Sequence, residues 1–213
     1  MKYKAILFDM DGTLLDTLTD MASAVNHILS VHGWPLRTTE EVRTFVGNGA
    51  RRLMERAVPT EVAGGAFEAV LAEYRDWYQA HNCVDTAPYP GIPALLAALA
   101  KAGIKTAVVS NKPDATTRAL AARFFPGLPA FGQRDDVPPK PAPDLVFRAL
   151  ETLGVDAADA AYVGDSEVDV ATARNAGLPL AAVSWGFRGR QALAEAGADT
   201  IADTAEELLE VLR

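Results

Sequence analysis

The stretch that decides the fold is Ala5-Ile-Leu-Phe-Asp-Met-Asp-Gly-Thr-Leu14, near the start of the chain. Four apolar residues run directly into two acidic residues and a glycine. A short apolar run that a polar, glycine-containing segment follows is typical of a buried strand and its loop. Asp9 and Asp11 flank a single residue, so in an extended segment their side chains point the same way. The sequence therefore predicts two carboxylates together at the carboxyl end of a strand.

Beyond this loop the sequence is helical in character up to about residue 86. Apolar residues recur at helical spacing in the stretches 21–32, 42–57 and 67–78. No run in this region reads as a strand. We therefore expect a helical insertion, residues 16–86, that interrupts a core domain of residues 1–15 and 87–213.

After the proline- and glycine-rich segment 87–93, strand-like and helix-like stretches alternate to the end of the chain. We expect strands at 105–109, 160–163, 180–183 and 200–201, and helices at 93–102, 113–124, 144–153, 167–176, 191–196 and 205–212. Such alternation implies right-handed crossovers and a parallel sheet. The predicted fold class is α/β, a three-layer Rossmann-like core with an inserted α-helical domain.

Three of the predicted strands are directly followed by residues that can take part in catalysis or ligand binding. Asp9 and Asp11 follow the first strand, Ser110 follows the second, and Asp165 follows a later one. Ligands of open α/β sheets bind outside the carboxyl ends of the strands, so we expect the three loops to converge. Carboxylates brought together repel one another, and a hard divalent cation such as Mg²⁺, which takes oxygen ligands, relieves that repulsion.

The same loops contain groups suited to an anion. Gly12 and Thr13 fit a loop whose backbone N–H groups face a phosphate. Ser110 and Asn111 stand just before a predicted helix, whose N-terminus favours anions. Lys140 lies between two prolines and presents a cation on a stiff loop. These parts indicate phosphoryl transfer, in which a carboxylate can form an aspartyl phosphate.

Four motifs in this order resemble those of the haloacid dehalogenase superfamily: Asp9-Met-Asp-Gly-Thr-Leu14, Ser110-Asn111, Lys140-Pro141 and Gly164-Asp-Ser-Glu-Val-Asp169. The resemblance spans nearly the whole chain, and the ordered set is far more specific than any one motif. It implies that Asp9 is the nucleophile and a Mg²⁺ ligand. It also implies that Asp11 is the general acid and base and binds the metal through its backbone carbonyl. The true dehalogenases lack an acid at the position of Asp11, so a carbon–halogen substrate is not expected.

The resemblance assigns the remaining residues of the motifs as well. It implies that Ser110, Asn111 and Lys140 contact the phosphoryl group. Asp165 completes the metal ligands of the protein. Asp169 is expected either to contact the metal-binding residues without touching the metal or to bind the metal itself.

The helical insertion resembles the mobile α-helical cap of this superfamily. Gly47-Asn48-Gly49-Ala50, followed by Arg51, resembles the cap loop of phosphoglycolate phosphatases. Arg51, Arg52 or Arg56 is then expected to meet a second anionic group, such as a substrate carboxylate. The alternative is a simple turn followed by a solvated arginine face. Residues 132–136 depart from phosphoglycolate phosphatases and look more like broadly assigned phosphatases, which leaves the substrate open.

The function we favour is hydrolysis of a small phosphomonoester through an aspartyl phosphate, with 2-phosphoglycolate as the leading substrate. The alternatives are a phosphomutase similar to β-phosphoglucomutase, a pyrophosphatase or nucleotidase of the same superfamily, and a non-catalytic phosphate-binding regulator. The presence of both Asp9 and Asp11 argues against the regulator. No G-x-G-x-x-G follows the first strand, which disfavours a nucleotide-binding oxidoreductase.

The composition of the chain limits the classes of molecule that it is expected to bind. The 213 residues are 49% hydrophobic and 23% charged, so a buried core is available, and the formal charge of −8 argues against general nucleic-acid binding. Cys83 is the one cysteine, which rules out an intramolecular disulfide. No run has the length of a membrane span, and no signal peptide is expected. We expect a cytoplasmic monomer or homodimer that acts on a small phosphorylated metabolite, with no nucleic-acid or membrane partner.

Two further groups of residues have competing interpretations. Trp185-Gly-Phe-Arg188 follows a predicted strand and is placed to line the site, although packing is the commoner role of such aromatic residues. His27, His32 and His81 all lie in the helical insertion. Surface or capping roles are expected for them rather than catalysis.

Overall fold

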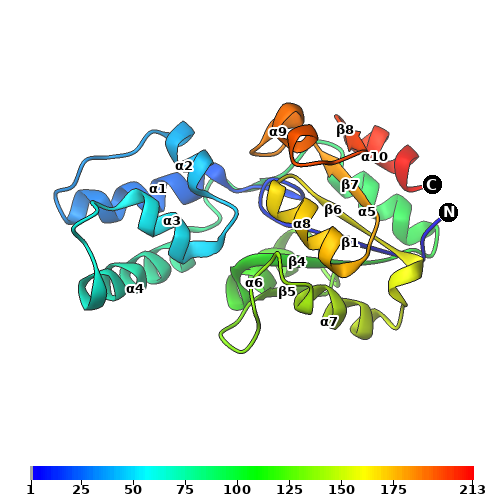
Figure 1. Cartoon of the computed structure of the whole chain (residues 1–213), viewed down its shortest axis with the longest axis horizontal. Helices are drawn as coiled ribbons and strands as arrows, with labels where there is room; N and C mark the ends of the chain where they lie inside the picture. Colours follow the sequence, from blue (N-terminus) through cyan, green and yellow to red (C-terminus); the bar gives the residue numbers. More distant parts are fainter. Residues whose placement is uncertain (1) are drawn as a thin grey trace. The chain divides into compact units, whose positions relative to one another are not determined.

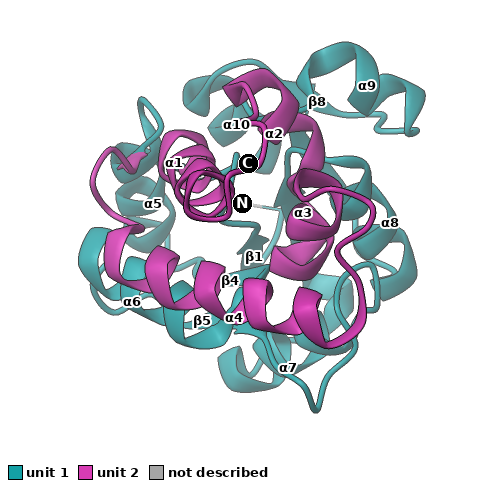
Figure 2. Ribbon diagram, turned by 90° about the vertical axis from the view of Figure 1, so that its left-hand side faces the viewer, with its two compact units in different colours: residues 1–16, 88–213 teal, residues 17–87 magenta. Residues whose placement is uncertain are grey.

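The chain folds into two compact units, which Figure 2 shows in different colours. Residues 1–16 and 88–213 form the core unit, and residues 17–87 form the helical unit. The structure is a computed structural model that describes residues 2–213. The boundaries expected from the sequence differ from these by one residue, and the role of the helical unit as a cap stays a prediction.

The core unit contains a six-stranded parallel sheet with the strand order β5-β4-β1-β6-β7-β8. Its strands are β1 (Ala5–Phe8), β4 (Lys105–Pro113), β5 (Ala130–Gln133), β6 (Ala160–Gly164), β7 (Leu180–Val183) and β8 (Ile201–Ala202). In the register of the central strands, Ala5 lies opposite both Lys105 and Ala160. All residues of β1 and β6 are buried, as expected for parallel strands that helices cover on both faces.

Helices cover the sheet of the core unit (Figure 1). They are α5 (Ile92–Lys101), α6 (Asp114–Phe124), α7 (Asp144–Leu153), α8 (Glu167–Ala176), α9 (Gly189–Glu195) and α10 (Ala205–Leu212), with a short 3₁₀ helix at Ala157–Asp159. α7 and α8 share a hydrophobic cluster with Leu7, Val109 and Tyr162 of the sheet. α5 and α10 contact each other, and right-handed crossovers place α5 on the opposite face. The structure confirms the predicted α/β fold with a parallel sheet.

The structure adds strands that the sequence does not predict. β5 has an interior glycine and is mostly half-buried, so its residues show no strand pattern. β4 continues four residues beyond its predicted end at Val109, because the polar side chains that follow are themselves buried. The strands β2 (Leu15–Asp16) and β3 (Ala87–Pro88) have two residues each, too few for any periodicity.

The helical unit consists of α1 (Leu18–Val31), α2 (Thr39–Phe45), α3 (Gly49–Ala57) and α4 (Gly64–His81). Neighbouring helices pack through apolar faces that include Val25, Leu29, Met54 and Leu71, all buried. α2 begins with a capping box, in which the Thr38 hydroxyl and the Glu41 carboxylate satisfy each other's backbone N–H groups. Within residues 2–213, no helix has both the length and the apolar character needed to cross a bilayer.

Candidate functional site

The carboxyl ends of the three central strands place the predicted site residues. Asp9 follows β1, Ser110 and Lys112 lie near the carboxyl end of β4, and Asp165 follows β6. β1 lies between β4 and β6, and the chain reaches these two strands by connections on opposite faces of the sheet. Such a topological switch point opens a crevice at the strand ends, where ligands of α/β proteins bind.

Three buried carboxylates gather in the core unit. Asp9, Asp165 and Asp169 each offer an oxygen, and these oxygens lie within 4.8 Å of one another. Burial raises the pKa of Asp9 to about 7, although Lys140 opposes the shift. Burial also raises the pKa of Asp165 well above its usual range, and the charges of Asp169 and Asp9 add to it. A buried donor set made only of carboxylate oxygens fits a hard divalent cation, which would offset this concentration of negative charge.

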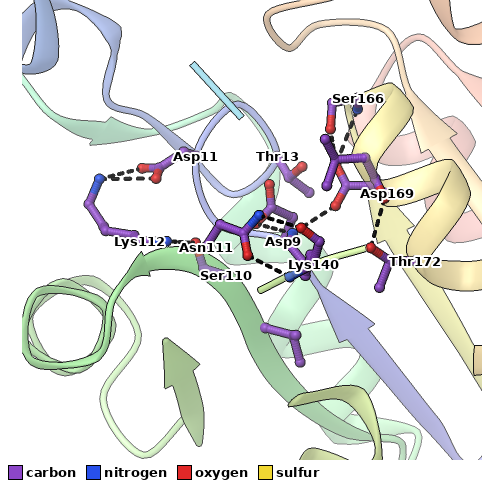
Figure 3. A network of polar contacts seen from close by, with 12 residues as sticks. Asp9, Asp11, Thr13, Ser110, Asn111, Lys112, Lys140, Ser166, Asp169 and Thr172 are labelled. Atoms are coloured by element: carbon purple, nitrogen blue, oxygen red, sulfur yellow. Dashed lines mark hydrogen bonds and ion pairs between the residues drawn. The ribbon is translucent and has the colours of Figure 1, made fainter. Parts of the chain in front are cut away.

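Lys140 stands between two of these carboxylates. Its ammonium lies 2.9 Å from Asp9 Oδ1 and donates to Asp169 Oδ1 at 2.8 Å (Figure 3). It also donates to Tyr162 Oη at 3.0 Å. Burial alone would lower the pKa of Lys140, but the charges of Asp169 and Asp9 outweigh it and raise that pKa well above its usual value. The lysine therefore keeps a fixed positive charge beside Asp9.

Asp169 is held by the first turn of α8. The backbone N–H and the hydroxyl of Ser166, the N-cap residue of α8, both donate to Asp169 Oδ2, at 3.2 and 2.6 Å. Its other oxygen accepts from Lys140. Asp169 thus belongs to the carboxylate cluster and links the first turn of α8 to Lys140. Its clearest role in the structure is to orient Lys140.

Asp165 is held by two loops from distant parts of the sequence. The Thr13 hydroxyl donates to Asp165 Oδ1 at 3.2 Å, and the backbone N–H of Phe187 donates to Oδ2 at 2.7 Å. The indole N–H of Trp185 in turn donates to the carbonyl oxygen of Thr13 at 3.1 Å. The segment after β7 therefore lines the site, which the sequence had left undecided. The expected phosphate-binding role of Thr13 stays a prediction.

Two glycines allow the backbone to approach Asp165. A Cβ atom added to Gly12 would lie 2.7 Å from Asp165 Cγ, and the residue has a φ of +84° that other residues rarely adopt. A Cβ atom added to Gly186 would collide with the Asp165 side chain and with the carbonyl oxygen of Gly12. The carboxylate can occupy its position only because neither residue has a side chain.

We expect Gly186→Ala to weaken Mg²⁺ binding by at least about tenfold, because the added methyl group displaces Asp165. Gly186 does not need a positive φ, so this collision is the main cost of the substitution. The measurement is the rise in melting temperature with added Mg²⁺. Gly65→Ala is the matched control, because its Cβ would meet nothing within 4 Å. An unchanged Mg²⁺ response in Gly186→Ala would contradict the predicted role of Asp165 as a metal ligand.

Asn111 supports the loop that contains Lys140. Its Nδ2 donates to the Lys140 carbonyl oxygen at 3.0 Å, and its Oδ1 accepts from the Lys140 backbone N–H at 2.8 Å. Both ends of the Asn111 amide thus bind this peptide, and the expected contact of Asn111 with a phosphoryl group stays a prediction. Ser110 Oγ accepts from the backbone N–H of Lys112 at 3.2 Å. α6 begins at Asp114, with Pro113 as its N-cap rather than its first residue.

Asp11 lies to one side of the carboxylate cluster and is paired with a second lysine (Figure 3). Lys112 Nζ donates to both carboxylate oxygens of Asp11, at 2.9 and 3.0 Å. No role for Lys112 follows from the sequence alone, because a lysine that directly follows a predicted strand usually lies in solvent.

The predicted anion-binding residues of the helical unit have partners within that unit. Asn48 and Gly49 form the start of α3, with Asn48 as the N-cap residue. Arg51 makes a two-point ion pair with Glu68, at 2.9 and 2.7 Å. Arg56 donates to a backbone carbonyl of α2 at 2.8 Å. Their expected contact with a substrate carboxylate stays a prediction.

Comparison with known proteins gives consistent matches over the chain. Residues 6–183 match the haloacid dehalogenase-like hydrolase family. An N-acetylmuramic acid 6-phosphate phosphatase from Pseudomonas aeruginosa is 36% identical, and the match covers 100% of this chain and 96% of the relative. A phosphoglycolate phosphatase from Pseudomonas savastanoi pv. phaseolicola is 34% identical, over 97% of this chain and 78% of the relative.

A solved structure agrees closely with the whole chain. The crystal structure of a protein from Lactobacillus delbrueckii subsp. bulgaricus, proposed to be a phosphoglycolate phosphatase, superposes with a TM-score of 0.94. The two sequences are 37% identical, and the match covers 100% of this chain and 99% of the other.

Proposed function

Because the chain belongs to the haloacid dehalogenase-like hydrolase family and is a phosphatase, we propose that it hydrolyses a small phosphomonoester through an aspartyl phosphate on Asp9. The observation that supports this most is the setting of Asp9. Its carboxylate lies at the end of the central strand β1, 2.9 Å from the ammonium of Lys140 and within the carboxylate cluster. The Asp9 carboxylate therefore lies beside the Lys140 ammonium and also belongs to a group of oxygens that could hold a metal ion.

In the proposed first half of the reaction, an Asp9 carboxylate oxygen attacks the phosphorus. The bond from phosphorus to the leaving oxygen breaks, and Asp11 gives that oxygen a proton. In the second half, Asp11 takes a proton from water, and the water oxygen attacks the phosphorus. The bond to Asp9 then breaks and inorganic phosphate leaves. Lys140 neutralises part of the phosphoryl charge throughout.

We propose Mg²⁺ as the metal, held by the carboxylates of Asp9 and Asp165 and by the backbone carbonyl of Asp11. When bound, such an ion supplies positive charge next to the phosphoryl oxygens. Asp169, also predicted as a ligand, has the role of orienting Lys140 in this proposal, because its Oδ1 accepts from that ammonium while Ser166 holds its Oδ2.

For the substrate we propose 2-phosphoglycolate, with N-acetylmuramic acid 6-phosphate as the second candidate. The first is the substrate in the names of several relatives. The second is favoured by one observation: the relative named for it matches over 96% of its own length, against 78% and 90% for the phosphoglycolate phosphatases from Pseudomonas savastanoi and Cupriavidus necator. Both compounds are phosphate monoesters that also carry a carboxylate. We therefore propose a substrate class defined by these two anionic groups.

The test compares matched pairs of substrates in Mg²⁺ and in EDTA. One pair is 2-phosphoglycolate and 2-hydroxyethyl phosphate, and the other is N-acetylmuramic acid 6-phosphate and N-acetylglucosamine 6-phosphate. For the pair that contains the enzyme's substrate, we expect the compound with a carboxylate to have a kcat/KM at least about tenfold higher than its partner without one. This ratio is equivalent to about 1.4 kcal/mol. Equal rates within both pairs would overturn the proposed class and leave a general phosphatase.

The same assay distinguishes the alternative activities. β-Glucose 1-phosphate that is converted to glucose 6-phosphate, rather than hydrolysed, would indicate a phosphomutase. A preference for pyrophosphate or a nucleoside monophosphate would indicate one of the other hydrolases. Release that is unaffected by EDTA would overturn the proposed metal dependence.

A further inference from the structure

Lys112 has an unusual position for a lysine. Its side chain is only 3% exposed, and the Asp11 carboxylate that it contacts is 14% exposed. An ammonium group so far from water is costly unless a charged partner satisfies it. The two contacts from Nζ, to Oδ1 and Oδ2 of Asp11, supply that partner.

The backbone around Lys112 holds this ammonium in place. The N–H of Lys112 donates to Ser110 Oγ at 3.2 Å, and its carbonyl oxygen accepts from Thr117 Oγ1 at 3.1 Å. These contacts tie the end of β4 to itself and to α6. Because Nζ reaches both oxygens of Asp11, it restricts the rotation of the carboxyl group as well as its position.

The two aspartates of the first motif therefore have separate lysines. Asp9 is paired with Lys140, and Asp11 is paired with Lys112 (Figure 3). Lys140 stands within the carboxylate cluster, where it also contacts Asp169. The contacts of Lys112 Nζ described above go to the group that exchanges protons in the proposed reaction.

We propose that Lys112 is the positioning residue of the acid–base group: it holds the Asp11 carboxyl in the orientation from which it protonates the leaving oxygen. This inference rests on the proposed function, in which Asp11 has that role. General acid catalysis contributes about 10²–10⁴-fold to a rate, and its contribution depends on the orientation of the acid. The effect is largest when the leaving oxygen belongs to an alcohol, because an alkoxide leaves poorly without a proton.

The test compares two phosphate compounds that differ in their leaving groups. One is the alkyl phosphate that the substrate assay identifies, and the other is acetyl phosphate, whose acetate leaves readily as an anion. The rate to compare is kcat/KM, because it reports the steps up to departure of the leaving group and not the later hydrolysis of the aspartyl phosphate, which both compounds share. We expect Lys112→Met to lower kcat/KM on the alkyl phosphate by about 100-fold. On acetyl phosphate we expect kcat/KM to fall by less than about fivefold, because proton donation contributes little there.

Three further variants complete the experiment. Lys105→Met, at the other end of β4, is the matched control and should have wild-type rates. Lys112→Arg keeps a donor that can contact both carboxylate oxygens and should recover part of the rate. In an Asp11→Asn background, Lys112→Met should cause no further loss, because Lys112 acts through Asp11. That double variant also removes both charges of the pair, so it remains informative if the single variant folds poorly.

The outcomes separate this inference from the proposed function. Equal losses of kcat/KM on both compounds, or a further loss of kcat/KM in the Asp11→Asn background, would show that Lys112 acts on folding or on phosphate binding and would overturn the inference. A faster Lys112→Met enzyme would overturn it too, because it would mean that the ion pair restrains Asp11. The proposed function fails by a different result, the absence of Asp9-dependent phosphate release from the wild-type protein.

Discussion

Asp9→Asn is expected to lower kcat for phosphate release by at least about 10⁴-fold, whichever phosphomonoester is the substrate. The amide has nearly the size of the carboxylate but has lost the anionic oxygen that attacks phosphorus. It also removes one of the charges that hold Lys140, whose second carboxylate partner, Asp169, remains. The fold should therefore survive, and thermal melting checks that it does.

The decisive measurement for this variant is covalent labelling rather than rate alone. Wild-type protein quenched with acid during turnover of a ³²P-labelled substrate should retain label that hydroxylamine releases, as an acyl phosphate does. Asp9→Asn should retain none. Asp159→Asn, at the amino end of β6 and paired with Lys4, is the control and should label like the wild type. Label on Asp9→Asn, or turnover near the wild-type rate, would show that another group is the nucleophile.

The sequence predicts those helices and strands that are marked by hydrophobic periodicity or by residues typical of helix ends. Alternation of strands and helices was visible from residue 93 onward, and the helices at Asp144–Leu153, Glu167–Ala176 and Ala205–Leu212 have the expected bounds. Each begins or ends at a residue with known preferences, such as Gly154 or Gly177 at a C-cap. The edge strand β5 carries no such signal, because its residues are only partly buried.

The contacts within the site depend on tertiary structure and were harder to predict. The motif order identified Asp9, Asp165, Asp169 and Lys140, which the structure brings together. It did not indicate that the Asn111 amide binds the Lys140 peptide, since an asparagine amide can bind a backbone or a ligand equally well. Hydrogen bonds between residues 29 apart depend on how two loops pack, and no spacing rule encodes that.

The contacts of Lys112 and of the segment after β7 could not be predicted for the same reason. A lysine next to a strand end is expected to lie in solvent unless the burial of that strand end is known. Trp185 and Phe187 contribute a ring N–H and a backbone N–H to the site, respectively. The backbone N–H is present at almost every position, so the residue type of Phe187 carries no information about this contact with Asp165.

Lys140→Met is expected to have the second large effect, on stability as well as on activity. Removing one partner of a buried ion pair costs about 3–5 kcal/mol, because the remaining charges stay buried without compensation. For a chain of this length such a loss lowers the melting temperature by roughly 10 °C. Phosphate release should also fall sharply, because Asp9 loses the cation beside it.

The pH dependence of this loss follows from the sign of the pKa shifts. In the wild type, the raised pKa of Lys140 keeps the lysine charged at all pH values below its usual range, so its own titration adds no pH dependence there. Without the lysine, the pKa of Asp9, already about 7, rises further. A carboxyl group with a raised pKa in the folded state makes stability fall as the pH rises from its unfolded pKa, about 4, through the folded value. The difference in melting temperature should therefore be larger at pH 8 than at pH 5.

Thermal unfolding in EDTA at both pH values tests this, since a bound metal would supply the missing charge. Asp169→Asn added to Lys140→Met should recover part of the stability at pH 8, because it removes one of the uncompensated carboxylates. Lys4→Met, which breaks an exposed ion pair with Asp159, should change the melting temperature little at either pH. A loss that is the same at pH 5 and pH 8, with no recovery in the double variant, would mean that Lys140 stabilises the core unit by packing and not by its charge.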